Sequence, residues 1–367
     1  MNMATTLEFP GFLDVHVHFR DPGVPEAETT LSGLAAASKG GFAAVVTMPN
    51  TSPACDSPDA LRRQIELSVG SVTRLFPSAC ITKGRLGREV ADLESLAEAG
   101  AAFFTDDGSY VSDPKVMESA MARSAELGMC ICQHAVDPLI QAGGVVRECS
   151  FAKRFGLKVI PAAAEYEAIR RDLSLCRETG CRLHIQHIST AEGVELVRSA
   201  QREGLPVSAE ATPHHLLLSC DELTVDDANF KMAPPLGNAE DRAELRRAVK
   251  DGVLMFATDH APHPAATKSH GFASGANGII GLETAIPITY AVMVEQEGMR
   301  VEDWAKAWWD MPRGLLAPGL RNAALGLAST VVEVGVRRAV SVADFVSLSR
   351  NCPYDGMEFE CWPREVR

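Results

Sequence analysis

The stretch GFLDVHVHFRDPG, residues 11–23, decides how this chain folds. Its first nine residues have the length and apolar content of a buried strand, in which successive side chains point to opposite faces. We therefore expect a polar face made by Asp14, His16, His18 and Arg20, and an apolar face made by Leu13, Val15, Val17 and Phe19. Burying imidazole is costly unless it is hydrogen-bonded or bound to a metal. The histidine pair predicts either a metal site or two ordinary core histidines.

Seven further apolar runs follow, separated by stretches with the 3.6-residue period of amphipathic helices. With the first run they predict strands near residues 11–19, 42–50, 73–83, 101–107, 129–135, 181–189, 205–212 and 253–260. Eight strands alternating with helices are typical of a closed barrel, and the turn HFRDPG lacks the glycine fingerprint of a doubly wound sheet. We predict an α/β fold with a (β/α)₈ TIM barrel over residues 1–330 and a C-terminal extension over residues 331–367.

The composition restricts the classes of protein to which the chain can belong. Of its 367 residues, 46% are hydrophobic and 23% are charged, which is enough apolar material for a substantial core. The formal net charge of −13 disfavours binding to nucleic acid or to an anionic membrane surface. The sequence has no unbroken run of about 18 apolar residues, so no membrane span is expected. The lack of a basic N-terminal region and of Cys-x-x-Cys pairs predicts a cytoplasmic protein without a thiolate zinc site.

Residues that could perform chemistry gather at the carboxyl ends of the predicted strands, where the sites of TIM barrels lie. They are His16, His18, Asn50, Asp106, Asp107, His134, His187 and Asp259. Four histidines with two aspartates, one of them from the Asp106–Asp107 pair, form a nitrogen and oxygen ligand set that suits zinc. Six ligands are too many for one tetrahedral zinc, but they suit two metals bridged by a carboxylate. Such a pair activates water and polarises a carbonyl, so hydrolysis of an amide, ester or phosphoester is expected.

Seven motifs occur in the order in which dihydroorotases of the amidohydrolase superfamily carry them: DVHVHFRDPG, TMPNT, FTDDG, HIQHIST, ATPHHLLLS, FATDHAPH and GIIGLET. The chain resembles that family from Pro10 to about Gly356, and DVHVHFRDPG and FATDHAPH are the most specific of the motifs. The resemblance implies a barrel of the metallo-dependent hydrolase type. It also implies the reversible, zinc-dependent conversion of N-carbamoyl-L-aspartate to (S)-dihydroorotate in de novo pyrimidine biosynthesis.

The same resemblance implies a metal centre with two zinc ions per chain, one ion being the alternative. Their ligands would be His16, His18, Asp107, His134, His187 and Asp259. Asp107 would bridge the two ions, and Asp259 would also be the catalytic general acid and base. Allantoinases and dihydropyrimidinases instead use a carboxylated lysine on the fourth strand. The strand AAFFTDDG has no lysine, which favours the dihydroorotase branch that uses aspartate.

Substrate contacts are also implied by the resemblance. They involve His18, Arg20, Asn50, Ala233, His263, Asn277 and Gly278. Arg20, Asn50 and His263 would hold the substrate carboxylate, while the backbone at Asn277 and Gly278 would meet the pyrimidine ring. The family's NPPLR reads APPLG here, with Ala233 and Gly237. If the family's asparagine contacts substrate through its backbone, Ala233 can replace it; if it does so through its amide, affinity falls.

Four other histidines are expected to be structural. His184 and His260 have the opposite strand parity to their neighbouring site residues, so His184 should face the helical layer. His214 and His215 lie in the predicted loop after the seventh strand.

The sequence is also compatible with alternatives for the domain organisation, the activity and the partners of the chain. Family members usually carry a small flanking β-sandwich, which we expect to be missing or reduced here, with residues 331–367 as its remnant. The alternative enzyme is a hydantoinase or an allantoinase, which the acidic-substrate contacts disfavour. A non-catalytic partner of aspartate transcarbamoylase is disfavoured because all six ligand positions are filled. A homodimer and an association with aspartate transcarbamoylase are both compatible with the sequence.

Overall fold

Eight parallel strands form a barrel in the computed structural model, which describes residues 4–367. They are β2 (Phe12–Val17), β3 (Phe42–Thr47), β4 (Arg74–Pro77), β5 (Phe104–Thr105), β6 (Cys130–Gln133), β7 (Arg182–Ile185), β8 (Val207–Ala211) and β9 (Leu254–Phe256). Hydrogen-bonded neighbours run β2-β3-β4 and β5-β6-β7-β8-β9. Parallel bridges between Ala79 and Phe104 and between Val17 and His260 join the two sheets. The ring therefore closes, and the predicted barrel is confirmed with all eight strands.

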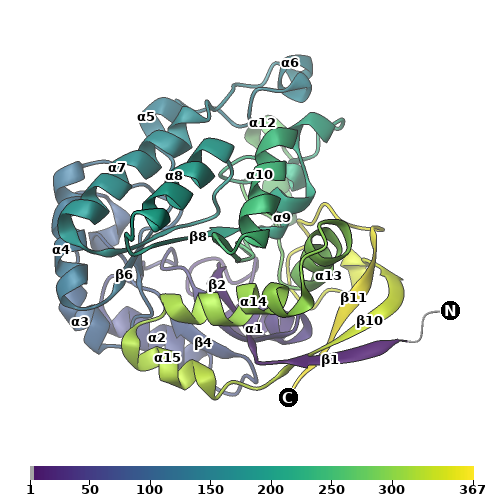
Figure 1. Ribbon diagram of the computed structural model, residues 1–367, viewed down its shortest axis with the longest axis horizontal. Coiled ribbons are helices and arrows are strands. Elements are labelled where there is room, and N and C mark those ends of the chain that lie inside the picture. Colours follow the sequence, from purple (N-terminus) through teal and green to yellow (C-terminus); the bar gives the residue numbers. More distant parts are fainter. Residues whose placement is uncertain (1–3) are drawn as a thin grey trace.

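Helices lie around this barrel and in the loops at its ends (Figure 1). They are α1 (Thr30–Lys39), α2 (Pro58–Leu67), α3 (Leu93–Glu98), α4 (Pro114–Glu126), α5 (Pro138–Gln141), α6 (Ser150–Phe155), α7 (Ala163–Thr179), α8 (Ala191–Arg202), α9 (Pro213–Leu217), α10 (Ala239–Lys250), α11 (Ala265–Lys268), α12 (Gly271–Ser274), α13 (Ala285–Thr289), α14 (Val301–Leu315) and α15 (Pro318–Leu325). A π-helical turn, Tyr290–Gln296, follows α13. Helix α14 packs on both β2 and β9, so it covers the seam between the first and last strands.

Capping residues fix where several of these helices begin. The side chain of Thr190 accepts a hydrogen bond from the backbone of Gly193 and begins α8, three residues after His187. Asn238 and Asp241 form a capping box at the start of α10. The cap at Thr190 ends the short loop between β7 and α8, and this loop carries His187.

The core has an inner and an outer layer, and β2 contributes to both. Leu13 and Val15 pack with residues such as Met255 inside the barrel, whereas Val17 and Phe19 pack in the larger cluster that includes the helices. The prediction that all four apolar side chains of this stretch share one face is therefore wrong. The pairing register with β3 shifts between Asp14 and Val17, and an irregularity of this kind reverses the face on which later side chains lie.

A second, smaller sheet joins the two ends of the chain. Strands β1 (Thr5–Phe9), β10 (Thr330–Ala339) and β11 (Glu358–Val366) pair antiparallel in the order β1-β10-β11. Figure 1 shows the purple N-terminal strand beside the two yellow C-terminal strands at one side of the barrel. The flanking β structure is thus reduced to three strands. The division into residues 1–330 and 331–367 stays a prediction, and β1 pairs with β10 across it.

Two further expectations concern membranes and cysteines. Among residues 4–367, no helix has both the length and the apolar character needed to cross a membrane. All ten cysteines are buried and free.

Candidate active site

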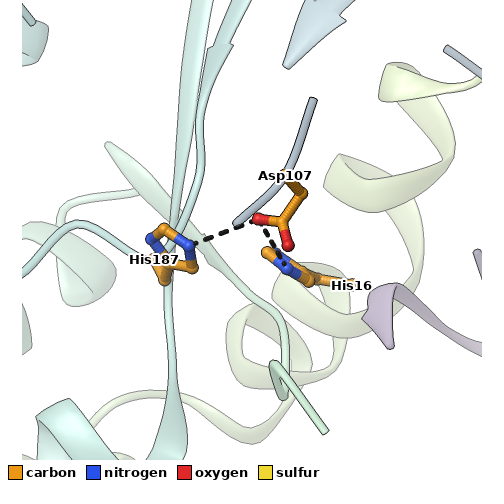
Figure 2. A group of neighbouring side chains, drawn as sticks. All are labelled: His16, Asp107 and His187. Atoms are coloured by element: carbon orange, nitrogen blue, oxygen red, sulfur yellow. Dashed lines mark ion pairs between the residues drawn. The ribbon is translucent and has the colours of Figure 1, made fainter. Parts of the chain in front are cut away.

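Three predicted ligands meet at the carboxyl end of the barrel. His16 belongs to β2, whereas Asp107 and His187 follow β5 and β7 by two residues each. Figure 2 shows the Asp107 carboxylate lying between the two imidazole rings. Oδ1 of Asp107 is 3.2 Å from Nε2 of His16 and 3.5 Å from Nε2 of His187. All three side chains are buried, and their ligand atoms lie within 4.8 Å of one another.

A second group shares His16 and adds His18 and Asp259. Nε2 of His18 is 2.9 Å from Oδ1 of Asp259, and Nε2 of His16 is 3.5 Å from the same oxygen. Within each group the ligand atoms lie within 4.8 Å of one another. His134 completes the predicted set, because its Nδ1 is 2.9 Å from Nε2 of His187. All six residues predicted as ligands are therefore neighbours.

The structure distinguishes the two aspartates of TDDG. Oδ1 of Asp106 accepts hydrogen bonds from the backbone amides of Ile81 and Thr82, at 2.9 and 3.1 Å, and Oδ2 accepts from the Thr82 hydroxyl. Asp106 therefore holds the loop after β4 and has no free oxygen for a metal. Asp107 faces the histidines instead, and the backbone of its loop is held by Nη2 of Arg85, which donates to the Asp107 carbonyl at 2.6 Å.

Glu210 on β8 contacts the ring nitrogen of His16 that does not face Asp107, and this role was not predicted from the sequence. Its Oε1 is 2.5 Å from Nδ1 of His16, and its Oε2 is 2.9 Å from Nε2 of His184. Burial would raise the pKa of Glu210, but His16 and His184 outweigh it and lower the pKa to about 2. An ionised Glu210 keeps the proton of His16 on Nδ1, which leaves Nε2 free to coordinate a metal.

His184 is buried and not on the helical side as predicted. It spans between Glu210 and the hydroxyl of Ser208, which is 2.8 Å from its Nδ1. The prediction misplaced His184 because it took His187 as an inward-facing strand residue and counted alternate positions back from it. His187 lies beyond the end of β7, where its φ of 34° departs from a strand.

The residues present fit a divalent metal. Nε2 of His16 and Oδ1 of Asp107 are buried and have no hydrogen-bond partner among the described residues. Orphaned buried polar atoms are costly, so a coordinated cation would satisfy both. Burial disfavours a charge on either group, but their mutual attraction outweighs it, raising the pKa of His16 and lowering that of Asp107. The histidine and carboxylate donors are those that zinc and similar ions bind.

Backbone strain marks two of the predicted ligands. In the described part of the chain, four non-glycine residues have positive φ angles, and two of them are His187 at 34° and Asp259 at 48°. Left-handed conformations are unfavourable for residues with a Cβ and concentrate at functional sites. The strain is consistent with side chains that are held in place for binding and not for stability.

A cavity of about 300 Å³ opens beside the ligand cluster, and Arg20 reaches into it. Its lining includes every residue predicted to contact substrate: His18, Arg20, Asn50, Ala233, His263, Asn277 and Gly278. Nε of Arg20 donates to the Pro262 carbonyl at 3.1 Å. Burial lowers the pKa of Arg20 to about 10, so its guanidinium remains positive at neutral pH. The cavity therefore combines a metal-ligand cluster with a fixed cation.

Other contacts pre-position the cavity wall. Nδ1 of His18 is 3.1 Å from Oδ1 of Asn50, and Nε2 of His263 is 2.6 Å from the Asn277 carbonyl. Because a carbonyl can only accept, His263 must carry a proton on Nε2. Burial, aided by Arg20, lowers the pKa of His263 to about 4, so the ring is neutral near pH 7.

The departure APPLG has a structural reason at its last position. A Cβ atom at Gly237 would lie 2.6 Å from Cβ of Asp241 and 2.8 Å from the backbone oxygen of Ser189. No side chain fits there without movement of the backbone. Ala233 lines the cavity, as the predicted backbone contact to a ligand requires.

Two of the remaining histidines are held by hydrogen bonds of their own. His215 lies 2.8 Å from Oγ1 of Thr212 and 3.2 Å from the Pro234 carbonyl. Nδ1 of His260 accepts from the Gly281 amide at 3.1 Å. These contacts agree with structural roles. His214 is buried in α9, and burial lowers its pKa to about 3.

Solved structures share this fold. An L-hydantoinase (dihydropyrimidinase) from Arthrobacter aurescens superposes with a TM-score of 0.84 at 25% identity, covering 98% of this chain and 83% of that chain. A dihydroorotase from Saccharomyces cerevisiae, solved in complex with 5-fluoroorotic acid, superposes with a TM-score of 0.73 at 17% identity and covers 99% of both chains. With the histidine and aspartate cluster, the fold defines a TIM-barrel hydrolase of the amidohydrolase superfamily.

Sequence similarity narrows the class further. Residues 6–193 match the family described as Dihydro-orotase-like. The dihydroorotase of Bacillus caldolyticus is 41% identical over 370 residues, covering 99% of this chain and 86% of that protein. The chain belongs to the dihydroorotase family.

Proposed function

We propose that this chain catalyses the reversible conversion of N-carbamoyl-L-aspartate to (S)-dihydroorotate and water, with zinc as its metal. The observation that carries the proposal is the shared cavity, in which the ligand cluster and the guanidinium of Arg20 lie side by side. A cyclic amide bearing a carboxylate is the kind of substrate that needs both. Family membership supports the same activity.

Arg20 is the group that selects an acidic substrate. A guanidinium offers parallel N–H donors that match a carboxylate, and within a buried site such bonds are strong. Asn50 and His263 line the same cavity and complete the proposed carboxylate pocket. Uncharged rings such as hydantoin would leave the partly buried cation of Arg20 without a carboxylate partner, which disfavours the alternative hydantoinase activity.

Asp259 is the proposed proton carrier. Burial would raise its pKa, but His16 and His18 outweigh it and hold the pKa well below its usual range, so Asp259 is ionised at neutral pH. In the hydrolytic direction water attacks the ring carbonyl next to the methylene. Asp259 accepts the proton of that water and delivers it to the ring nitrogen as the carbon–nitrogen bond breaks. Ring closure follows the same path in reverse.

The metal ions would be held by His16, His18, Asp107, His134, His187 and Asp259, with Asp107 between two ions. When bound, they supply an activated water and polarise the carbonyl. Two zinc ions per chain are proposed, and elemental analysis after gentle purification should find between one and two equivalents. The cytoplasm is the proposed compartment. Gel filtration alone and with aspartate transcarbamoylase tests a homodimer and that association.

The deciding experiment is a substrate panel. The purified chain with added zinc is assayed with dihydroorotate, hydantoin, dihydrouracil and allantoin. Preference for dihydroorotate is expected, because it alone among the rings offers Arg20 a carboxylate next to a scissile cyclic amide. Equal or better turnover of an uncharged ring would overturn the assignment. A folded chain that binds no metal and stays inert in added zinc would support the non-catalytic alternative.

Asp259→Asn tests the proton carrier separately. Asparagine keeps the shape and one ligand oxygen but cannot carry a proton, so the rate should fall by about 10²–10⁴-fold while most metal stays bound. His16→Ala is the comparison, because it should lose metal together with activity. Retention of more than about a tenth of the wild-type rate by Asp259→Asn would assign the proton transfer to another group.

A further inference from the structure

A segment near the C-terminus lies directly behind the cavity. Asn351 follows the cavity residue Gly278 by 73 positions in the chain, yet the two are hydrogen-bonded. The residue is only 3% exposed and does not itself line the cavity. Any effect that Asn351 has on a ligand must therefore act through the residues that it touches.

The amide of Asn351 contacts three cavity-lining residues at once. Nδ2 donates to the Ala261 carbonyl at 2.9 Å and to the Gly278 carbonyl at 3.1 Å. Oδ1 accepts from the backbone amide of His263 at 3.2 Å. The orientation of the amide is unambiguous, since its nitrogen faces two acceptors and its oxygen faces a donor. One side chain thus joins both ends of the loop between Ala261 and Gly278.

Neighbouring groups show that the position of this loop is tightly defined. Nζ of Lys268 also donates to the Gly278 carbonyl, at 2.7 Å, and Oγ of Ser349 donates to the His263 carbonyl at 3.0 Å. Gly278 has a φ of 128°, and a Cβ there would lie 2.6 Å from that of Ala261. The backbone at Gly278 therefore approaches Ala261 too closely for any other residue, and Asn351 closes this contact from behind.

We propose that Asn351 is a positioning residue that holds the Ala261–Gly278 loop in its substrate-binding form. The proposal rests on the proposed function, because it takes His263 and Gly278 as substrate contacts. In the described part of the chain, the side-chain hydrogen bonds of Asn351 go to Ala261, His263 and Gly278 and not to any of the six metal-ligand side chains. Its loss should therefore weaken substrate binding and leave metal content and the chemical step largely intact.

Asn351→Asp is the sharpest test because it changes one donor into an acceptor at nearly constant shape. The new carboxylate oxygen would face the carbonyls of Ala261 and Gly278, which repel it. A missing or repulsive buried hydrogen bond costs enough for a KM increase of about 10-fold or more, with kcat within about 3-fold of wild type. Asn322→Asp on the exposed face of α15 is the matched control and should behave as wild type.

The pH dependence separates positioning from general damage. Burial and the two facing carbonyls raise the pKa of the new carboxyl group by more than Lys268, whose Nζ donates to the same Gly278 carbonyl, lowers it, and the protonated form regains a donor. The ratio of variant to wild-type KM should therefore shrink as the pH falls from about 8 to about 6. A variant that is only misfolded would show no such recovery.

A readout without substrate keeps this proposal distinct from the proposed function. Backbone hydrogen exchange should become faster in residues 261–280 of Asn351→Asp, but not in α3, and metal content should match that of wild type. Faster exchange in this loop supports the positioning role even if dihydroorotate proves not to be the substrate. The proposal would be overturned if wild type turns over dihydroorotate and Asn351→Asp shows both the exchange rates and the KM of wild type.

Discussion

Replacing Glu210 by glutamine should weaken metal binding without unfolding the barrel. Glutamine keeps the volume but offers one oxygen and one amide nitrogen where Glu210 has two acceptors, for His16 and His184. The oxygen can stay on His16. His184 can move its proton to Nδ1, where Ser208 Oγ lies 2.8 Å away, and accept the new amide at Nε2. The network thus stays satisfied, and only the charge is lost.

The magnitude follows from the bond to His16. A hydrogen bond to a charged group contributes about 1.5–3 kcal/mol, against about 0.5–1.5 kcal/mol for a neutral one. Losing the charge on the 2.5 Å contact should therefore cost about 1–1.5 kcal/mol, close to a 10-fold loss of metal affinity. This lies at the lower end of the effect of groups that orient metal-bound histidines.

Competition with a chelator of known zinc affinity measures the effect, with elemental analysis as the endpoint. Glu240→Gln, on an exposed position of α10, is the control and should bind zinc as wild type does. Glu210→Ala should lose more, because it leaves both imidazoles without an acceptor. If Glu210→Gln binds zinc as tightly as wild type, the argument that Glu210 prepares His16 for the metal is refuted.

Three further predictions concern other parts of the molecule. Arg20→Lys should raise KM for dihydroorotate by about 10- to 100-fold with little change in kcat, because a charge-assisted bond contributes roughly 1.5–3 kcal/mol; normal steady-state kinetics would place the carboxylate elsewhere. Gly237→Arg should lower the free energy of unfolding by about 1–3 kcal/mol in urea titrations, since its Cβ would clash with Asp241, while Gly319→Arg, which has open space, should not. Burial holds the pKa of His214 at about 3, below its usual 6.5, so the unfolded state binds more protons between these values. Stability of the metal-free protein should therefore fall by up to about 1.4 kcal/mol per pH unit below about pH 6.5 for this group, and His214→Gln should flatten that dependence in urea titrations at several pH values.

Much of the fold follows from local patterns in the sequence. Apolar runs of strand length between amphipathic helices identified all eight barrel strands, and the rule that barrel sites lie at strand ends brought the six ligand candidates together. Strict alternation failed at β2, because a register shift depends on the partner strand β3 and leaves no local signal. A remnant of the flanking β structure was expected in residues 331–367, but its pairing with β1 was not predicted, since pairing between β1 and β10 is a long-range choice.

The supporting residues could not be identified in the same way. Glu210 lies within the buried strand VSAEA, and its role appears only when β2 and β7 bring His16 and His184 to it. A carboxylate in the middle of such a strand is the one signal that was present, since burying it unpaired is costly. Asn351 offered even less, because nothing in RNCPYDG indicates which distant loop it contacts.

The sheet that unites β1 with β10 and β11 has a consequence for the order of events during synthesis. Thr5 pairs with Val334, so β1 leaves the ribosome long before its partner strand β10 has been made. The barrel strands each find a neighbour much sooner. β1 must wait as an unpaired edge, a state that exposes backbone donors and acceptors to other chains. The side chains of β1 are largely polar or exposed in the folded protein, and Glu8 pairs with Arg367, which follows β11. β1 therefore exposes little apolar surface before β10 has been made.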